Sequence, residues 1–319
     1  MSRIHEALKK AEQERANVQG AAMDVPASSP NSSSVTEPTT APVWAQQTQE
    51  VSATAAALEL PAAFHTEGFL RFDDLLGHCA RPTWHLDPNV NVFFNQNLSV
   101  HGAEQFRTLR SRLYQLRGSQ QLRTLLVTSA IPGEGKTFVT SNLAQAIVRQ
   151  PDRRALIIDA DLRCARLHLP LGAPTSPGLT DYLRGEADEM AVIQHGQEGN
   201  LCFIAGGNEV TDPSELLSNG RLKKLLDRVT PVFDWVILDS PPCVPVADAS
   251  ILANLCDGVL LVVRAGTTPS EIAGRARQEL KGKNVIGVVL NAVDDAGLYG
   301  SAYYQAYGYG YGEQKRVQS

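Results

Sequence analysis

The stretch Leu122–Leu143, LRTLLVTSAIPGEGKTFVTSNL, joins an apolar run to a glycine-containing loop and then to a helical pattern. Residues 125–127 form a short apolar run that is typical of a buried strand. Gly133 and Gly135 allow the backbone to approach a ligand closely, and a helix begins with free N–H groups and a partial positive charge. The stretch therefore predicts a strand, an anion-binding loop and a helix, an arrangement that cradles phosphate groups.

Side chains in the loop add specific chemistry to this cradle. The Lys136 ammonium can reach the outer phosphates, and the Thr137 hydroxyl stands where it can bind Mg²⁺. The usual pattern starts with glycine, whereas Ala130 stands at that place here. A glycine-rich turn with a surface lysine is the alternative, but a strand before and a helix after favour phosphate binding. The nucleotide-binding residues expected here are Gly133, Glu134, Gly135, Lys136, Thr137 and Phe138.

The composition favours a globular protein that stays inside the cell. Hydrophobic residues make up 43% of the 319 residues, which is enough for a sizeable core, and a net charge of −5 gives no general attraction to nucleic acid. No run approaches the roughly 18 apolar residues of a membrane span, and the N-terminus lacks the apolar core of a secretory signal. The cysteines have no paired spacing, so we expect reduced, buried thiols at Cys79, Cys164, Cys202, Cys243 and Cys256.

Shifts in composition divide the chain into five segments. Residues 1–16 have the apolar spacing of a short amphipathic helix, and residues 17–66 lack lysine and arginine and are rich in Ala, Ser, Thr, Pro and Gln, which predicts a disordered linker. Residues 67–101 show no sustained period and form an unassigned lead-in that we expect to pack on the domain after it. Residues 102–296 form the predicted P-loop domain, and residues 297–319 form a flexible tail.

A predicted helix over residues 102–116, GAEQFRTLRSRLYQL, carries an ionic strip beside its apolar stripe. The strip consists of Glu104, Arg107 and Arg110, which repeat every three residues on one face. Arginine geometry suits paired hydrogen bonds to carboxylates, so the strip can meet another subunit. A solvated charged face is the alternative.

Two apolar runs downstream end in acidic residues. ALIIDADLR, residues 155–163, carries Asp159 and Asp161, and FDWVILDSPP, residues 233–242, carries Asp239. Because the carboxyl ends of parallel strands meet at one edge of a sheet, we expect these carboxylates beside the phosphate loop. One of the first two can accept a proton from a hydroxyl or water while the other helps to hold Mg²⁺, and Asp239 can reach Mg²⁺ directly or through water.

The rest of the pattern alternates strands with helices, which predicts an α/β, doubly wound, mostly parallel sheet. Asp212 and the proline after it predict the start of a helix. Asn291 follows the last apolar run and either reads an adenine edge or forms a turn. Strands are expected over residues 201–204, 258–263 and 285–290, and helices over residues 212–228 and 270–280.

Six of the eight tyrosines lie in the C-terminal tail, separated by small residues without a period that would bury them. A stacking and aggregation-prone tail, an adhesive segment and a set of phosphate acceptors all fit this composition. The six are Tyr299, Tyr303, Tyr304, Tyr307, Tyr309 and Tyr311.

Four motifs, in this order, resemble those of the bacterial tyrosine kinases of the capsular and exopolysaccharide type, a branch of the deviant P-loop ATPases related to MinD and ParA. EQFRTLR resembles their Glu-x-x-Arg-x-x-Arg strip, and AIPGEGKT, LIIDADLR and VILDSPP resemble their three nucleotide motifs. The terminal tyrosine cluster is similar to the one that these kinases phosphorylate. SAIPG lacks the early lysine of the MinD and ParA relatives, which favours the kinase branch.

The resemblance implies roles for the residues in these motifs. Lys136 and Thr137 are expected to bind ATP and Mg²⁺. Asp159 is the expected base for the tyrosine hydroxyl, with support from Asp161, and the expected metal site consists of Thr137, Asp159 and Asp239. The ionic strip is expected to mediate ring-like self-association.

The resemblance also implies partners and a location. A neighbouring subunit is expected to phosphorylate the tail, and a transmembrane polysaccharide co-polymerase, fused or separate, is the expected activator. The protein would then lie in the cytoplasm at the inner face of the membrane, where it controls polysaccharide synthesis or export, without a nucleic-acid partner. An ATPase switch of the MinD type and a scaffold that only binds nucleotide remain as alternatives.

Overall fold

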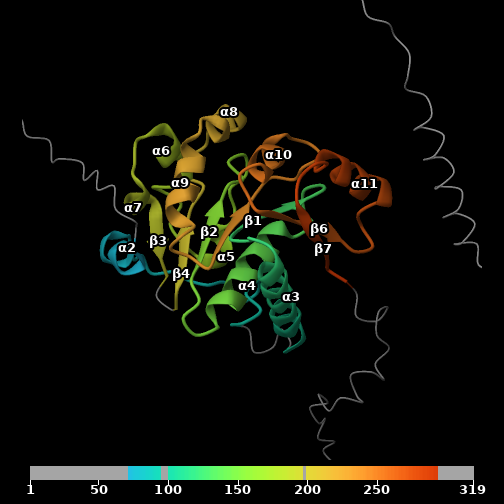
Figure 1. Cartoon of the computed structure of the whole chain (residues 1–319), viewed down its shortest axis with the longest axis horizontal. Helices are drawn as coiled ribbons and strands as arrows, with labels where there is room; N and C mark the ends of the chain where they lie inside the picture. The colour runs from blue at the N-terminus through green and yellow to red at the C-terminus, as the bar shows by residue number, and fades with distance from the viewer. Residues whose placement is uncertain (1–70, 95–99, 197–198, 294–319) are drawn as a thin grey trace, which may run out of the picture. The chain divides into compact units, whose positions relative to one another are not determined.

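The computed structural model describes residues 71–94, 100–196 and 199–293. Figure 1 draws the other residues as a grey trace. The predicted N-terminal helix, the linker and the tyrosine tail all lie outside the described residues. None of the described helices is long and apolar enough to span a membrane.

A seven-stranded sheet forms the centre of the described chain (Figure 1). Its order is β3-β4-β2-β5-β1-β6-β7, and only β3 runs antiparallel to its neighbour among the described strands. This arrangement confirms the prediction of a doubly wound, mostly parallel α/β fold. The strands are β1 (Thr124–Ser129), β2 (Ala155–Asp159), β3 (Ile193–His195), β4 (Leu201–Ile204), β5 (Trp235–Asp239), β6 (Gly258–Arg264) and β7 (Val285–Asn291).

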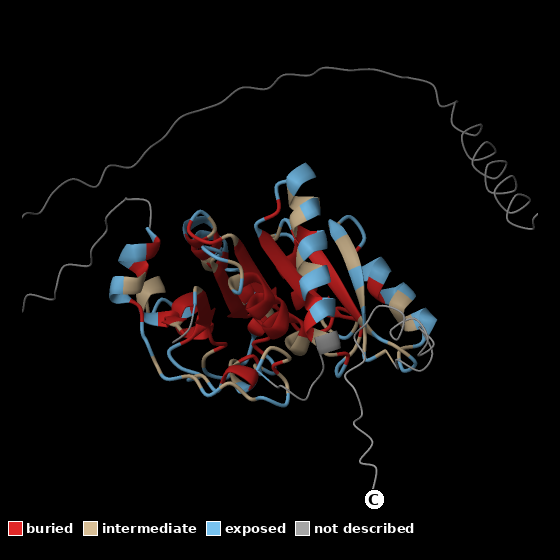
Figure 2. Cartoon of the chain, turned by 90° about the horizontal axis from the view of Figure 1, so that it is seen from below, coloured by how far each residue is buried: buried red, intermediate tan, exposed pale blue. Residues whose placement is uncertain are grey.

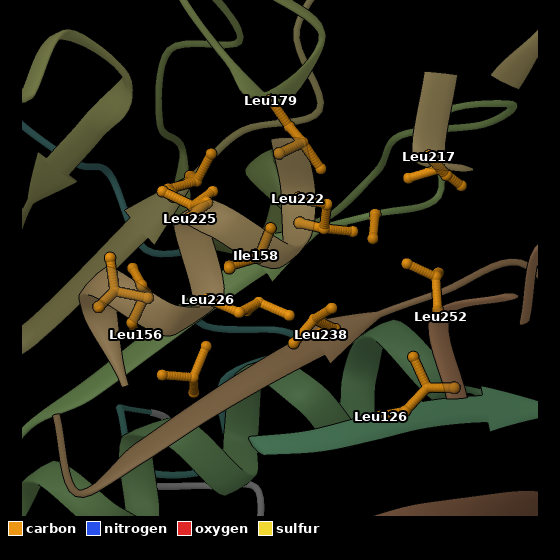
Figure 3. Packing of buried hydrophobic residues seen from close by; sticks show 14 of the residues in the cluster. Leu126, Leu156, Ile158, Leu179, Leu217, Leu222, Leu225, Leu226, Leu238 and Leu252 are labelled. Atoms are coloured by element: carbon orange, nitrogen blue, oxygen red, sulfur yellow. The ribbon is translucent and has the colours of Figure 1, made fainter. Parts of the chain in front are cut away.

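Helices cover both faces of the sheet, so alternate residues of the central strands enter two apolar clusters. Leu126 and Ile158 pack with α9 and α10, and Leu125 and Ile157 pack with α3 and α4. Figure 2 shows the buried strands in red between helices whose outward faces are exposed, and Figure 3 shows leucines of α9 against the strand residues. The helices are α2 (Phe72–His78), α3 (Val100–Ser119), α4 (Lys136–Val148), α5 (His168–Leu171), α6 (Leu179–Arg184), α7 (Glu189–Val192), α8 (Pro213–Ser218), α9 (Arg221–Val229), α10 (Asp248–Ala253) and α11 (Ser270–Glu279).

The single helix expected over residues 212–228 is wrong, because two helices, α8 and α9, occupy this stretch. Gly220 separates them with a φ of 81°, a left-handed conformation that ends a helix and that glycine adopts without strain. Asp212 does stand before the first helix, but its side chain makes no capping hydrogen bond.

The lead-in that the sequence left unassigned packs on the domain, as expected. Phe72 of α2 meets Phe233 edge to face, with ring centroids 5.7 Å apart. Further along, the buried Asn142 of α4 donates to the carbonyl of Val90 (2.8 Å) and accepts from the amide of Val92 (2.9 Å). The lead-in therefore contacts both layers of the domain before α3 begins.

The cysteines are free thiols, but they are not all buried. Cys79, Cys202 and Cys243 are buried as expected, and Cys256 is half-buried. Cys164 is exposed, so the prediction was wrong for this residue, which lies in the turn after β2.

Gly172, which follows α5, gives a test of the lead-in packing. A Cβ at this position would lie 2.2 Å from the carbonyl oxygen of His85, and the φ of 58° is already unfavourable for alanine. Gly266 has a similar φ of 65° with nothing within 4 Å, so it is the matched control. We expect Gly172→Ala to lower the free energy of unfolding in urea by about 1 to 3 kcal/mol more than Gly266→Ala does. Equal losses would contradict the packing of the lead-in.

Candidate active site

The loop between β1 and α4 forms the expected cradle. Gly133 and Gly135 adopt φ values of 83° and 94°, and α4 begins at Lys136 directly after the second glycine. A Cβ on Gly135 would lie 2.0 Å from Nδ2 of Asn291, so a side chain there would displace the Asn291 amide from the loop. The N-terminal amides of α4 are left free for an anion.

The side chain of Glu134 points into the protein and not toward a ligand. It is 2% exposed, and its carboxylate accepts from the amide of Ile131 (2.8 Å), the amide of Arg264 (3.3 Å) and the hydroxyl of Thr268. Glu134 can therefore contribute only its backbone to phosphate binding, and its carboxylate holds the loop against the end of β6. The sequence could not reveal this, because Arg264 and Thr268 lie about 130 residues away.

Asn291 and Phe138 also make contacts that the sequence did not predict. The Asn291 amide donates to the carbonyl oxygen of Glu134 (2.8 Å), so it supports the phosphate loop from the end of β7. The Phe138 ring packs against Phe106 of α3, with centroids 5.7 Å apart, which leaves its backbone as the part that can face a phosphate. Adenine recognition by Asn291 stays a prediction.

Three carboxylates and one ammonium lie together at the carboxyl edge of the sheet. Asp159 and Asp239 end the adjacent strands β2 and β5 and are register partners. Both are buried, at 0% and 1% exposure, and Asp161 is 3% exposed. The Lys136 Nζ lies 3.0 Å from Oδ2 of Asp161. The Thr137 hydroxyl donates to Asp239 (2.6 Å), so the predicted metal-site residues Thr137 and Asp239 are in direct contact.

Asp159 is held by the backbone of the loop that follows it. One of its carboxylate oxygens accepts from the amide of Leu167 (2.8 Å), and the other accepts from the amide of Asp161 at 3.3 Å. These bonds fix the orientation of the carboxylate, which is a requirement for a group that accepts a proton at a defined place.

Burial and mutual repulsion shift the proton affinities of this cluster. Burial, reinforced by the charge of Asp239, raises the pKa of Asp159 well above its ordinary value. Burial also raises the pKa of Asp239 to about 6, against the opposing effects of Lys136 and the Thr137 hydroxyl. Burial disfavours the charged form of Lys136, but the carboxylates of Asp239, Asp161 and Asp159 outweigh it, and the net pKa is raised. The site therefore holds more negative charge than its lysine can balance.

A divalent cation fits this charge and this donor set. If all three carboxylates are ionised, the cluster with Lys136 carries a net charge of −2. Within the described residues, no group of three His, Cys, Asp or Glu side chains is arranged to hold a metal by itself. Mg²⁺ commonly takes one or two protein oxygens and completes its shell with water and substrate phosphates. Thr137 and Asp239 offer such oxygens.

The two arginines of the ionic strip on α3 make different contacts. Arg107 pairs with Glu104 on the same exposed face. Arg110 instead donates to the carbonyl oxygen of Ala146 (2.6 Å) and so ties α3 to α4. Glu104 and Arg107 are therefore exposed to solvent, whereas Arg110 already stabilises the fold.

The fold and the site together define the class of protein, a P-loop α/β protein with an acidic cluster behind its phosphate loop. No family model matches the chain. Tyrosine-protein kinase YwqD of Bacillus subtilis is 35% identical over 192 residues, which are 59% of this chain and 80% of YwqD. Tyrosine-protein kinase etk of Escherichia coli is 35% identical over 211 residues, which are 66% of this chain and 29% of etk.

A solved structure agrees with the sequence comparison. The kinase domain of Escherichia coli tyrosine kinase ETK matches with a TM-score of 0.61 and 33% identity, over 67% of this chain and 85% of that domain. The chain belongs to the bacterial tyrosine-protein kinase family. It spans most of YwqD but less than a third of etk.

Replacing Asp239 by asparagine should stabilise the nucleotide-free protein at neutral pH. Folding raises the pKa of the Asp239 carboxyl from 3.8 to about 6, so the folded state binds this proton more tightly than the unfolded state does. The resulting stabilisation is fully present below about pH 4 and is lost as the pH rises through about 6. Asparagine removes this loss. Asp239→Asn should therefore become more stable relative to the wild type as the pH rises from about 4 through about 6. The difference in their free energies of unfolding should grow by an amount on the order of 3 kcal/mol at most.

Urea denaturation at several pH values from 4 to 7.5 measures this difference. A difference that stays constant or shrinks as the pH rises would contradict the burial of an ionisable carboxylate at this position.

Proposed function

We propose that the chain is an ATP-dependent protein-tyrosine kinase that uses Mg²⁺ and phosphorylates the tyrosine tail of a neighbouring copy. The observation that carries this proposal is the meeting of Lys136, Thr137 and three aspartates at one edge of the sheet, directly behind a phosphate loop. Phosphoryl transfer depends on positioning and charge neutralisation more than on covalent catalysis, and these residues supply both.

Each residue has a separate task in the proposed reaction. The tyrosine hydroxyl oxygen forms a bond to the γ-phosphorus, the bond from that phosphorus to the bridging oxygen breaks, and ADP leaves with the electron pair. Asp159 accepts the hydroxyl proton, and its raised pKa makes it a stronger base than an ordinary aspartate. Lys136, held beside Asp161, contacts the phosphates. Mg²⁺, held through Thr137 and Asp239, neutralises charge on the phosphate oxygens when bound.

The proposed setting follows from family membership and from the sequence. Residues 102–296 form the kinase domain, and residues 297–319 form the tail that receives phosphate. A transmembrane polysaccharide co-polymerase activates the kinase at the inner face of the membrane. Phosphorylation of the tail then controls exopolysaccharide or capsule synthesis or export.

Lys136→Met should abolish tail phosphorylation, because it removes the only cation in the described cluster that can contact the phosphates. The matched control is Lys223→Met, which also removes a lysine paired with an aspartate, Asp227 at 2.7 Å, but on an exposed face of α9. Intact-mass analysis after incubation with ATP, Mg²⁺ and an activator segment reads the result. Phosphotyrosine that persists in Lys136→Met would overturn the proposal.

An ATPase switch of the MinD type is the alternative function. It would release ADP while the tail stays at its unmodified mass. A scaffold that only binds nucleotide would show neither ADP nor added phosphate. The same incubation of the wild type therefore separates all three functions.

Self-association through α3 is also part of the proposal, and substitutions in this helix test it separately. Arg107→Ala should reduce the mass measured by light scattering under associating conditions, because Arg107 and Glu104 form the exposed part of the strip. Arg112→Ala is the control, since it removes an exposed arginine of the same helix outside the strip. Arg110→Ala should instead lower thermal stability, because its bond to Ala146 is lost. An unchanged mass for Arg107→Ala would contradict this role for the strip.

A further inference from the structure

One buried acidic residue close to the active site has no part in the chemistry described above. Asp248, the first residue of α10, is 0% exposed. Its carboxylate receives two bonds from one guanidinium, from Nε of Arg163 to Oδ2 (2.7 Å) and from Nη2 to Oδ1 (3.2 Å). Such a paired geometry is specific to arginine and fixes both groups in one plane. A buried carboxylate held in this way needs a reason, because burial of charge is costly.

Ser214 completes the cluster and shows what it connects. The Ser214 hydroxyl donates to Asp248, and Nη2 of Arg163 donates to the Ser214 hydroxyl oxygen at 3.0 Å. Arg163 follows β2, Ser214 lies in α8 after β4, and Asp248 begins α10 after β5. β4, β2 and β5 are neighbours in the sheet. One guanidinium therefore ties together the segments that leave the carboxyl ends of three adjacent strands. We call Arg163, Ser214 and Asp248 the three-strand clamp.

A short turn connects the clamp to the active site. The amide of Cys164 donates to the backbone carbonyl of Asp161 and to its Oδ1, both at 3.1 Å, so residues 161–164 form a closed turn. Arg163 lies inside this turn. The other carboxylate oxygen of Asp161 faces the Lys136 ammonium at 3.0 Å. The position of the Asp161 carboxylate is thus set on one side by the turn and, through Arg163, by the buried Asp248.

We propose that Arg163 and Asp248 are positioning residues for phosphoryl transfer, which hold the turn at residues 161–164 so that Asp161 stays aligned with Lys136. This rests on the proposed kinase function. Neither residue touches Lys136 or the phosphate loop in the structure, so they act on turnover through Asp161 and leave the phosphate cradle intact. Loss of the clamp should lower kcat much more than it raises KM for ATP.

Three single variants, one double variant and a matched control test the clamp. Arg163→Met removes the guanidinium, and Arg163→Lys keeps the charge but loses the paired geometry. Asp248→Asn keeps the shape of the buried group. Arg153→Met is the matched control, because Arg153 pairs with Asp234 at 2.9 Å and has similar exposure, 46% against 40% for Arg163, at the opposite ends of the same strands β2 and β5.

We expect Arg163→Met to lower the rate of ADP formation at saturating ATP by about tenfold or more, with KM for ATP changed by less than about twofold. Arg163→Lys should recover part of the rate. The double variant Arg163→Met with Asp248→Asn should lose little beyond the larger single loss, because both changes break one interaction. Arg153→Met should keep the wild-type rate. The positioning role would be overturned if the two rate losses multiply in the double variant, or if Arg153→Met lowers the rate as much as Arg163→Met does.

A second measurement separates failure of the clamp from failure of the kinase proposal. Amide hydrogen exchange of the peptide spanning residues 160–167 needs no activity and reports directly on the turn. It should be faster in Arg163→Met than in the wild type and unchanged in Arg153→Met. If the wild type forms ADP without phosphotyrosine, the kinase proposal fails, but hydrogen exchange still shows whether Arg163 holds the turn. Unchanged exchange in Arg163→Met would overturn the clamp even if tyrosine transfer is observed.

Discussion

The pairing of β2 with β5 places two buried aspartates side by side, and much of the site depends on this constraint. Parallel register puts Asp159 opposite Asp239 at the edge where the phosphate loop leaves β1. Each carboxylate raises the cost of ionising the other, and burial adds to that cost. The protein meets this cost with fixed donors, which are the Lys136 ammonium, the Thr137 hydroxyl and backbone amides of the loop after β2.

The same constraint explains why the surrounding loops are so closely tied. A cluster with excess negative charge is useful for phosphoryl transfer only when its oxygens are held in place, since a cation and phosphates must fit among them. Glu134 fixes the phosphate loop to the end of β6, and Arg163 joins the segments after β4, β2 and β5. In both cases a buried carboxylate accepts several hydrogen bonds that hold an irregular segment in place.

The sequence revealed the parts of this site that local patterns encode. The phosphate loop, the acidic strand ends and the parallel sheet follow from hydrophobic runs and glycine positions within short windows. Contacts between distant segments left no such signal. The inward turn of Glu134 depends on Thr268, and the clamp depends on Asp248, which stands in the sequence as an ordinary acid at the start of a helix. Arg110 fits the pattern of the ionic strip, yet its guanidinium donates a hydrogen bond to a backbone carbonyl of α4. The break at Gly220 was missed because helical spacing continues across it.

In the proposed reaction this acidic site transfers phosphate to tyrosine and does not merely hydrolyse ATP. The most direct measurement is the ratio of phosphotyrosine to ADP during the first turnovers of the wild-type protein with ATP, Mg²⁺ and an activator segment. We expect one phosphotyrosine within residues 299–311 for each ADP formed. ADP that accumulates while these tyrosines remain unmodified would contradict it.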